Sequence, residues 1–304
     1  MVKLFTHTDL DGVGCAILAK LAFGANNADI TFCNYDDVND LVSDFVPTKL
    51  LPDDMCHITD IRVSDELAKE INENMTQFYL LDHHPTALGL NKYDWCKVVI
   101  EDEETHIKTS GTEMYYEWLT ENGYLIEDEF IHKFVELVRN YDTWRWSTLG
   151  DDGLICKQVN DLYYLYGREK FMKWAMSEIC DKVFPRLYAA DELVLSMKQN
   201  EIDEYVEKKN KQIRVMDMFG HVCGFVFAER FFSELGNRLC QMHPEIDFVA
   251  MIDMDGTVSY RTVKENIDLG NDVAKLFGGG GHPKAAGSQF SNEIKMKLIE
   301  NIFR

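Results

Sequence analysis

Residues 79–84 read Tyr-Leu-Leu-Asp-His-His, and this stretch decides the fold. Its apolar first half predicts a short buried strand, and Asp82, His83 and His84 come where that strand ends. Because the two histidines are adjacent on an extended segment, they point in different directions, so one can bind a metal while the other faces a substrate. A surface or core histidine pair is the alternative, and the surrounding sequence decides between the two interpretations.

Strand and helix patterns alternate on both sides of this stretch. Short apolar runs predict strands at residues 2–6, 30–34, 55–61, 78–81 and 97–100. Helical patterns lie between them at residues 12–23 and 38–46, and another helix is expected after Ser64, whose side chain would cap it. This β-α-β-α order predicts an α/β fold with a largely parallel sheet covered by helices.

The first predicted strand runs into His7-Thr8-Asp9-Leu10-Asp11-Gly12. Alternation along an extended segment points the side chains of His7, Asp9 and Asp11 to the same side. Carboxylate and imidazole ligands on one side suit Mn²⁺ or Mg²⁺. Open α/β sheets also bind their ligands at the carboxyl ends of the strands, which is where this segment lies.

Two single aspartates extend the pattern. Asp60 ends the strand that contains residues 57–59, and Asp142 lies in the loop after a predicted helix. Either residue taken alone is more typical of a helix cap or a turn. The strand-end residues should nevertheless share one edge of one sheet, and their combination predicts a metal site there.

Helical patterns dominate the middle of the chain, at residues 111–122, 128–140 and 169–180. One long, heavily charged helical pattern then runs from Leu187 to Ile213 and is expected to connect two domains. Strand, helix and hairpin signals follow it, with the hairpin turning at Asp255-Gly256. We therefore expect a first domain at 1–186, a linker helix at 187–213 and a smaller α/β domain at 214–304.

Four consecutive glycines, Gly278–Gly281, precede His282-Pro283-Lys284. Glycine adopts backbone conformations closed to other residues, so the N–H groups of such a run can converge on a phosphate or a carboxylate. A flexible loop is the alternative, but the adjacent histidine and lysine favour a binding role. Arg261, at the end of a predicted strand, is a candidate phosphate ligand, with an ordinary ion pair as the alternative.

Taken in order, these motifs resemble the DHH phosphoesterase superfamily. His7–Asp11 is similar to its first motif, Asp60 to its second, Asp82-His83-His84 to its third and name-giving motif, and Asp142 to its fourth. Residues 278–287 resemble the signature of the DHHA1 substrate domain. The resemblance covers nearly the whole chain and is greatest to oligoribonucleases (nanoRNases) and cyclic-nucleotide phosphodiesterases. It implies a parallel-sheet DHH domain joined by the linker helix to a DHHA1 domain.

The resemblance also implies a site for two divalent cations, with Mn²⁺ expected and Mg²⁺ or Co²⁺ as alternatives. The implied ligands are His7 and Asp9 for one cation, Asp11 and His83 for the other, Asp60 as a bridge, and Asp142 to complete the site. One residue separates His7 from Asp9, whereas many relatives have three.

The remaining implied roles concern the substrate. Asp82 would orient its neighbours, and His84 would touch a phosphate oxygen during catalysis. The implied grip on the substrate's phosphate end comes from Arg261, Gly280, Gly281 and His282.

The charge of the chain limits its partners. It has 304 residues, with 52 Asp and Glu against 31 Lys and Arg, which gives a formal net charge of −21. Proteins that hold long nucleic acids by the backbone need a basic face, and this sequence has no run of Lys or Arg. We therefore expect a short RNA oligonucleotide or a small nucleotide as the substrate, and no long nucleic acid. Nothing in the sequence indicates the oligomeric state.

The eight cysteines are scattered and form no C-x-x-C pair. This pattern is typical of reduced, buried thiols rather than of a zinc ribbon or a redox motif. No signal peptide is evident, and no apolar stretch approaches the ~20 residues needed to cross a bilayer. The sequence therefore predicts a cytoplasmic protein without a membrane partner.

The leading hypothesis is Mn²⁺-dependent hydrolysis of very short RNA to mononucleotides. A second phosphoesterase hypothesis has a small nucleotide as the substrate, namely a cyclic mononucleotide, a signalling dinucleotide or a 3′,5′-bisphosphate. Inorganic pyrophosphatases share the motifs of the first domain, but they lack the Gly-rich His signature. A catalytically dead nucleotide sensor is the alternative from another class, and the intact set of candidate ligands argues against it.

Overall fold

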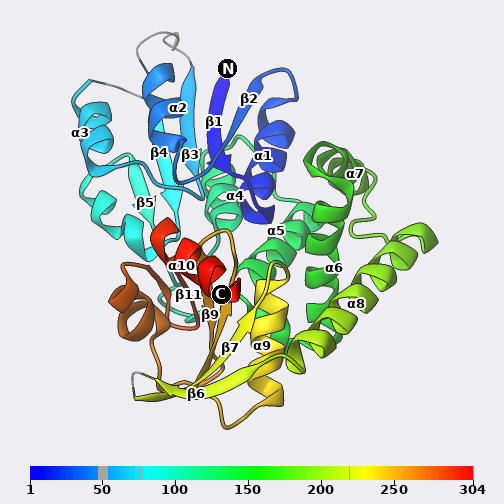
Figure 1. Cartoon of the computed structure of the whole chain (residues 1–304). Helices are drawn as coiled ribbons and strands as arrows, with labels where there is room; N and C mark the ends of the chain where they lie inside the picture. The colour runs from blue at the N-terminus through cyan, green and yellow to red at the C-terminus, as the bar shows by residue number, and fades with distance from the viewer. Residues whose placement is uncertain (47–53, 75–76, 219, 304) are drawn as a thin grey trace. The chain divides into compact units, whose positions relative to one another are not determined.

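The computed structural model describes residues 1–46, 54–74, 77–218 and 220–303 (Figure 1). Contacts between residues divide the chain into two compact units, one ending at Leu195 and the other beginning at Ser196. The boundary between them falls within one long helix, α8 (Ala189–Asn210). Each unit has its own sheet and its own hydrophobic cores.

The first unit is built on a five-stranded sheet in the order β2-β1-β3-β4-β5 (Figure 1). Every neighbouring pair of strands is parallel, so the predicted parallel sheet is confirmed. The strands are β1 (Val2–His7), β2 (Ala28–Cys33), β3 (Met55–Thr59), β4 (Phe78–Asp82) and β5 (Cys96–Val98). Their carboxyl ends bring the candidate residues of the first, second and third motifs to one edge.

Helices cover both faces of this sheet, and adjacent residues of β1 contribute to opposite cores. Leu4 packs with residues of α1, α4 and α5, whereas Phe5 packs with residues of α2, α3 and η1. The helices of this unit before α8 are α1 (Leu10–Phe23), α2 (Val38–Phe45), α3 (Asp65–Asn74), η1 (Pro85–Lys92), α4 (Gly111–Glu121), α5 (Glu129–Asp142), η2 (Arg145–Thr148), α6 (Asp151–Tyr166) and α7 (Arg168–Cys180). Ser64 caps α3 as expected, because its hydroxyl accepts a hydrogen bond of 3.2 Å from the Leu67 N–H.

The second unit contains a mixed sheet of six strands in the order β10-β11-β9-β8-β7-β6. Only the pair β7–β8 is parallel. Residues of α9 pack on one face, and η3 and η4 pack on the other. The elements are β6 (Arg214–Met218), β7 (His221–Phe227), α9 (Phe232–Met242), β8 (Phe248–Ile252), β9 (Thr257–Arg261), η3 (Leu269–Val273), η4 (Ala274–Phe277), β10 (Gly280–His282), β11 (Ala285–Gln289) and α10 (Asn292–Ile302).

Several elements were not predicted from the sequence. In α6, the ion pair between Lys157 and Asp161 is buried on the inner side of the helix and interrupts the apolar period. β6 is an edge strand whose residues are mostly exposed, so it lacks the alternation of a half-buried strand. β10 consists of two glycines and a histidine, which no strand propensity favours.

Helices of membrane-spanning length and hydropathy do not occur within the described ranges.

Candidate metal centre

Three overlapping groups of possible metal ligands meet at the carboxyl edge of the five-stranded sheet. Within each group, the ligand atoms lie within 4.8 Å of one another. The groups are His7, Asp9 and Asp60; Asp11, His83 and Asp142; and Asp60, Asp82, His83 and His84. The structure thus brings together every residue that the sequence analysis assigned to the first four motifs, although they come from positions 7 to 142 of the chain.

Each ligand is held by the end of a regular element. Asp9 caps α1, where its side chain accepts a hydrogen bond of 3.1 Å from the Gly12 N–H. Asp60 follows β3 with a φ of 57°, a left-handed conformation that is unusual outside glycine and asparagine. Asp142 is the last residue of α5. The helix extends beyond its predicted end at residue 140, so the predicted loop position of Asp142 is wrong. The helix therefore fixes the direction of this carboxylate.

Asp60 lies between the other candidate ligands. Its Oδ1 is 3.3 Å from Nε2 of His83, and its Oδ2 is 3.9 Å from Nδ1 of His7. On the His7 side, Asp9 Oδ2 is 2.9 Å from the same Nδ1. The short spacing between His7 and Asp9 therefore still lets both side chains reach the centre.

The second side of the centre gathers around His83. Its Nε2 is 3.6 Å from Asp11 Oδ2 and 3.6 Å from Asp142 Oδ2. Burial lowers the pKa of His83, so the imidazole is held neutral and its nitrogen is available as a ligand. One carboxylate from each of three different elements thus faces the same ring nitrogen.

The electrostatics of this edge fit a divalent cation. Burial and the neighbouring Asp11 and Asp9 carboxylates raise the pKa of Asp60 well above its usual value. Asp60 Oδ2, Asp82 Oδ2 and His83 Nε2 are buried and make no hydrogen bond to any described residue. Buried acceptors without partners are costly, and a cation placed among them would satisfy them and relieve the repulsion between the carboxylates. The donor set of carboxylates and imidazoles suits Mn²⁺.

The start of α4 is a part of the centre that sequence reasoning missed. Both oxygens of Asp11 accept hydrogen bonds from it, Oδ2 from the Gly111 N–H at 2.6 Å and Oδ1 from the Thr112 N–H at 2.8 Å. The Thr112 hydroxyl also donates to the Asp11 carbonyl at 2.6 Å. A helix N-terminus attracts a nearby anion, so α4 holds the Asp11 carboxylate in place through these hydrogen bonds. Ser110-Gly111-Thr112 is a readable capping signal, but no capping pattern tells which carboxylate the helix meets.

Glycine is required at position 111. A Cβ added there would lie 2.5 Å from the Cβ of Asp60 and 3.2 Å from Oδ2 of Asp11. No side chain fits at this approach, so α4 can reach both ligands only because residue 111 is glycine.

Asp82 and His84 form a pair beside the centre. Asp82 Oδ1 accepts hydrogen bonds from the His83 N–H at 2.8 Å and from Nδ1 of His84 at 2.7 Å. Burial raises the pKa of Asp82, but the contacts with His84 outweigh it and the pKa is lowered. Burial likewise lowers the pKa of His84, but Asp82 outweighs it and the pKa is raised. Because an ionised carboxylate only accepts, Nδ1 of His84 carries a proton and Nε2 is the nitrogen turned elsewhere.

Two candidate phosphate ligands of the second unit, Arg261 and His282, lie on strands of the same sheet. His282 of β10 pairs with Ala285 of β11, and Ala285 pairs with Arg261 of β9. Residues directly opposite in antiparallel strands point to the same face, so His282 and Arg261 share a face with one strand between them. The structure therefore brings these two residues of the Gly-rich signature and the hairpin together.

Arg261 makes no direct ion pair within the described residues, although the Glu234 carboxylate acts on its charge and opposes the lowering of its pKa. Its guanidinium donates to the Tyr260 carbonyl at 2.8 Å and to the Ser233 hydroxyl at 3.1 Å. Burial lowers its pKa, and across the described residues no carboxylate oxygen lies within 4.0 Å of it. The ordinary ion pair considered for this residue is therefore not what the structure contains.

Close packing explains some of the four glycines but not all of them. A Cβ on Gly279 would lie 2.0 Å from the Gly287 carbonyl oxygen, and one on Gly281 would lie 2.6 Å from Cα of Ala286. A Cβ on Gly280 would meet nothing within 4 Å. The last two glycines of the run begin the edge strand β10, so Gly280 leaves open backbone at the sheet edge near His282.

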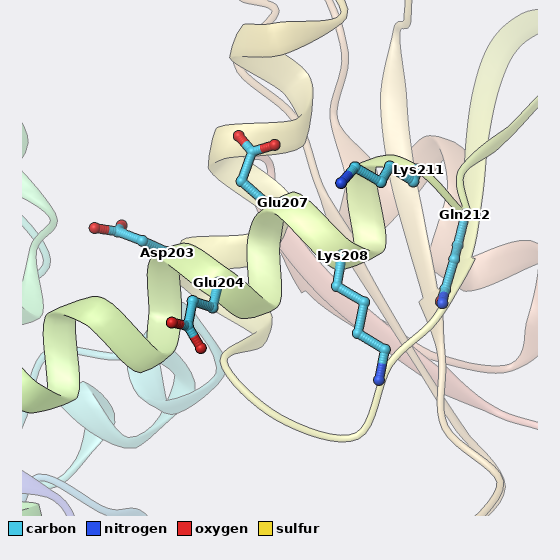
Figure 2. Close-up of a pocket in the computed structure, with 6 residues that line it drawn as sticks. All are labelled: Asp203, Glu204, Glu207, Lys208, Lys211 and Gln212. Atoms are coloured by element: carbon cyan, nitrogen blue, oxygen red, sulfur yellow. The ribbon is translucent and has the colours of Figure 1, made fainter.

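A hollow on the second unit lies apart from these residues. Figure 2 shows its lining side chains on the last turns of α8 and just beyond, and they are Asp203, Glu204, Glu207, Lys208, Lys211 and Gln212. Most of them are exposed and carry charges of both signs. The hollow is a solvated helix surface, and no candidate residue of the motifs lines it.

Comparison with known proteins identifies the family. The chain is 34% identical to the oligoribonuclease NrnB of Bacillus subtilis (strain 168), over all of this chain and 76% of that protein. No protein-family model matches it. Its fold is similar to an exonuclease RecJ bound to manganese, with a TM-score of 0.60, 14% identity and coverage of 98% of this chain and 88% of that one. It is also similar to PggH of Vibrio cholerae, a pGpG-specific phosphodiesterase, with a TM-score of 0.53, 14% identity and coverage of 99% and 97%.

The last two similarities support the fold alone, whereas the first, together with the four motifs at one sheet edge, supports kinship. The chain therefore belongs to the DHH phosphoesterase family and is a hydrolase of nucleotide phosphoesters.

Proposed function

We propose that the protein hydrolyses very short RNA oligonucleotides to mononucleotides with the help of two divalent cations, with Mn²⁺ preferred. The observation that carries this proposal is the position of Asp60, whose two oxygens face His83 on one side and His7 on the other. A carboxylate placed in this way can bridge two cations. The identity of 34% to an oligoribonuclease supports RNA as the substrate class.

In this proposal, His7 and Asp9 hold one cation, Asp11 and His83 hold the other, and Asp142 completes the second group. When bound, the cations supply Lewis-acid stabilisation of the charge that develops on the reacting phosphate. The N-terminus of α4 keeps the Asp11 side chain in place through the hydrogen bonds from residues 111 and 112. Metal ligands held in this way lose little freedom when a cation arrives.

We assign His84 to the substrate. Its Nδ1 is tied to Asp82, so its Nε2 is the nitrogen that would approach a phosphate oxygen from a fixed direction. Asp82 thereby acts as a positioning residue rather than as a ligand.

Arg261, His282, Gly280 and Gly281 are proposed to hold the terminal phosphate of the substrate. Arg261 is a half-buried cation with no carboxylate oxygen within 4.0 Å among the described residues, and it shares a face of its sheet with His282. An anion is the group that such a surface would bind. A short substrate follows from the overall charge of −21, because extra nucleotides would meet a surface that releases few counterions.

The test is a turnover panel with purified protein and Mn²⁺. It contains a dinucleotide, a short RNA oligomer, a long single strand, a cyclic mononucleotide, a 3′,5′-bisphosphate and pyrophosphate. We expect the dinucleotide and the short oligomer to be cleaved fastest and the chelator EDTA to abolish turnover. Faster turnover of a cyclic mononucleotide or of the bisphosphate would move the function to a small nucleotide, and no turnover of any member would favour a sensor.

A further inference from the structure

We propose that Tyr35 is a positioning residue for the reaction, and that its hydroxyl fixes the imidazole of His84 for contact with the phosphate. The inference rests on the role proposed above for His84. It adds a residue that lies outside all of the recognised motifs.

Tyr35 reaches the centre from the end of β2. The last residue of that strand, Cys33, pairs with His7, so the residues that follow lie at the same carboxyl edge. The ring of Tyr35 has its centroid 5.2 Å from that of His7 and 6.2 Å from that of His84. Its hydroxyl oxygen is 3.4 Å from Nε2 of His84.

The imidazole of His84 is held from both sides. Its Nδ1 donates to Asp82, and its Nε2 is the nitrogen that meets the Tyr35 hydroxyl. A ring contacted at both nitrogens cannot rotate freely, so Nε2 keeps one direction.

A purely structural role accounts poorly for this arrangement. The Tyr35 side chain is 56% exposed, so it contributes little to a hydrophobic core. The distance of 3.4 Å is long for a hydrogen bond, as is common for catalytic contacts in a free enzyme, which shorten when the substrate binds. Asp82, His84 and Tyr35 thus form a chain of contacts from a buried carboxylate to the exposed rim of the centre.

The test is a double-mutant cycle with Tyr35→Phe and His84→Ala, which removes the hydroxyl in the presence and in the absence of its partner. We expect Tyr35→Phe to lower kcat by about tenfold, with KM and Mn²⁺ binding unchanged. In the His84→Ala background the same substitution should change kcat by less than about twofold, because Tyr35 acts through the missing ring.

A matched control and a second readout separate this role from a general effect. Tyr124→Phe removes a hydroxyl that contacts the sulfur of Met55, at the opposite end of the sheet, and should leave kcat unchanged. In protein labelled with ¹⁵N-histidine, Tyr35→Phe should shift the Nε2 resonance of His84 without any substrate, whereas Tyr124→Phe should not.

Three results would overturn the proposal. An equal loss of kcat in both backgrounds would mean that Tyr35 contacts the substrate directly. Full activity of Tyr35→Phe with loss of activity in Tyr35→Leu would reduce the role to packing of the ring against His7. An unshifted His84 resonance would remove the contact itself. If the dinucleotide proved not to be a substrate, the cycle would use the panel member that is cleaved. The His84 resonance is measured without substrate, so a wrong substrate assignment and a wrong role for Tyr35 would give different results.

Discussion

The carboxyl edge of the five-stranded sheet and the β9–β11–β10 side of the six-stranded sheet carry unbalanced charges of opposite sign. The first contains buried carboxylates such as Asp60, whose Oδ2 lacks a hydrogen-bond partner within the described residues. The second contains the half-buried guanidinium of Arg261, which has no carboxylate within 4.0 Å in the part of the chain described. One region therefore suits cations and the other suits an anion.

Because the two regions bind different groups, substitutions in one should leave the function of the other intact. Loss of a group at the metal edge should alter both cation binding and chemistry. Loss of a group on the other sheet should alter only the capture of substrates that have the phosphate it holds.

The largest effect is expected from Asp60→Asn. Asparagine tolerates the left-handed φ of 57° and has a similar shape, but it removes the charge between the two ligand groups. We expect turnover to fall by about a thousandfold or more and the Mn²⁺ content to drop by one or both ions. Metal analysis and kcat of the purified variant check this, and near-normal activity would disprove the two-cation assignment.

The same variant tests whether the buried charge of Asp60 destabilises the metal-free protein. Because burial and the adjacent carboxylates raise the pKa of Asp60, its charge destabilises the metal-free fold at neutral pH. Asp60→Asn should therefore keep or raise the melting temperature in EDTA, and Mn²⁺ should stabilise the variant less than the wild type. A variant that melts earlier in EDTA would mean that the loss of activity reflects unfolding.

His83 and His84 should divide the effects of the metal edge between them. His83→Ala removes a nitrogen that faces three carboxylates, so Mn²⁺ occupancy should fall along with turnover. His84→Ala should leave occupancy nearly unchanged and lower turnover by about a hundredfold, the size of a lost acid, base or phosphate contact. Metal analysis of both variants showing the reverse pattern would exchange the two roles.

Gly111→Ala should weaken the metal edge without removing any ligand. Its new Cβ would lie 2.5 Å from Cβ of Asp60, so α4 must shift away from Asp60 and Asp11. We expect the Mn²⁺ affinity, measured by titration calorimetry, to fall by about 10- to 100-fold, as for other losses of ligand support. Gly89→Ala is the control, since nothing lies within 4 Å of its added Cβ. Equal Mn²⁺ affinities of the two variants would show that the close approach of α4 to Asp11 and Asp60 does not support metal binding.

The sequence predicted the metal edge better than it predicted what supports it. A carboxylate at a strand end is local information, and parallel strands then bring Asp60, Asp82 and His83 to one edge. The hydrogen bond from the Gly111 N–H to Asp11 joins residues 100 positions apart, and no local pattern encodes such a contact. Tyr35 was missed for the same reason, because the sequence around an aromatic residue after a strand does not indicate which distant residues it contacts.

The Gly-rich segment was predicted less completely. Its binding role was inferred from the glycines and from His282, but its strand conformation was not, because glycine disfavours strands in general. Close approach of Gly279 and Gly281 to β11 overrides that preference. The register between Arg261 and His282 likewise appears only once the sheet order is known.

The smallest effect, and the one that separates the two regions most sharply, is expected from His282→Ala. His282 is exposed on an edge strand of the second sheet, so its loss should preserve the fold and the full Mn²⁺ content. We expect kcat/KM for a dinucleotide with a terminal phosphate to fall by about tenfold, the size of one phosphate contact. Hydrolysis of a small artificial phosphodiester, which has no terminal phosphate to be held, should stay within about twofold of the wild type. Arg261→Ala should act in the same direction, and because both side chains share one face of the sheet, the double variant should lose less than the product of the two single losses. Loss of Mn²⁺ in His282→Ala, or an equal loss against both substrates, would place His282 in the metal centre and end the division between the two regions.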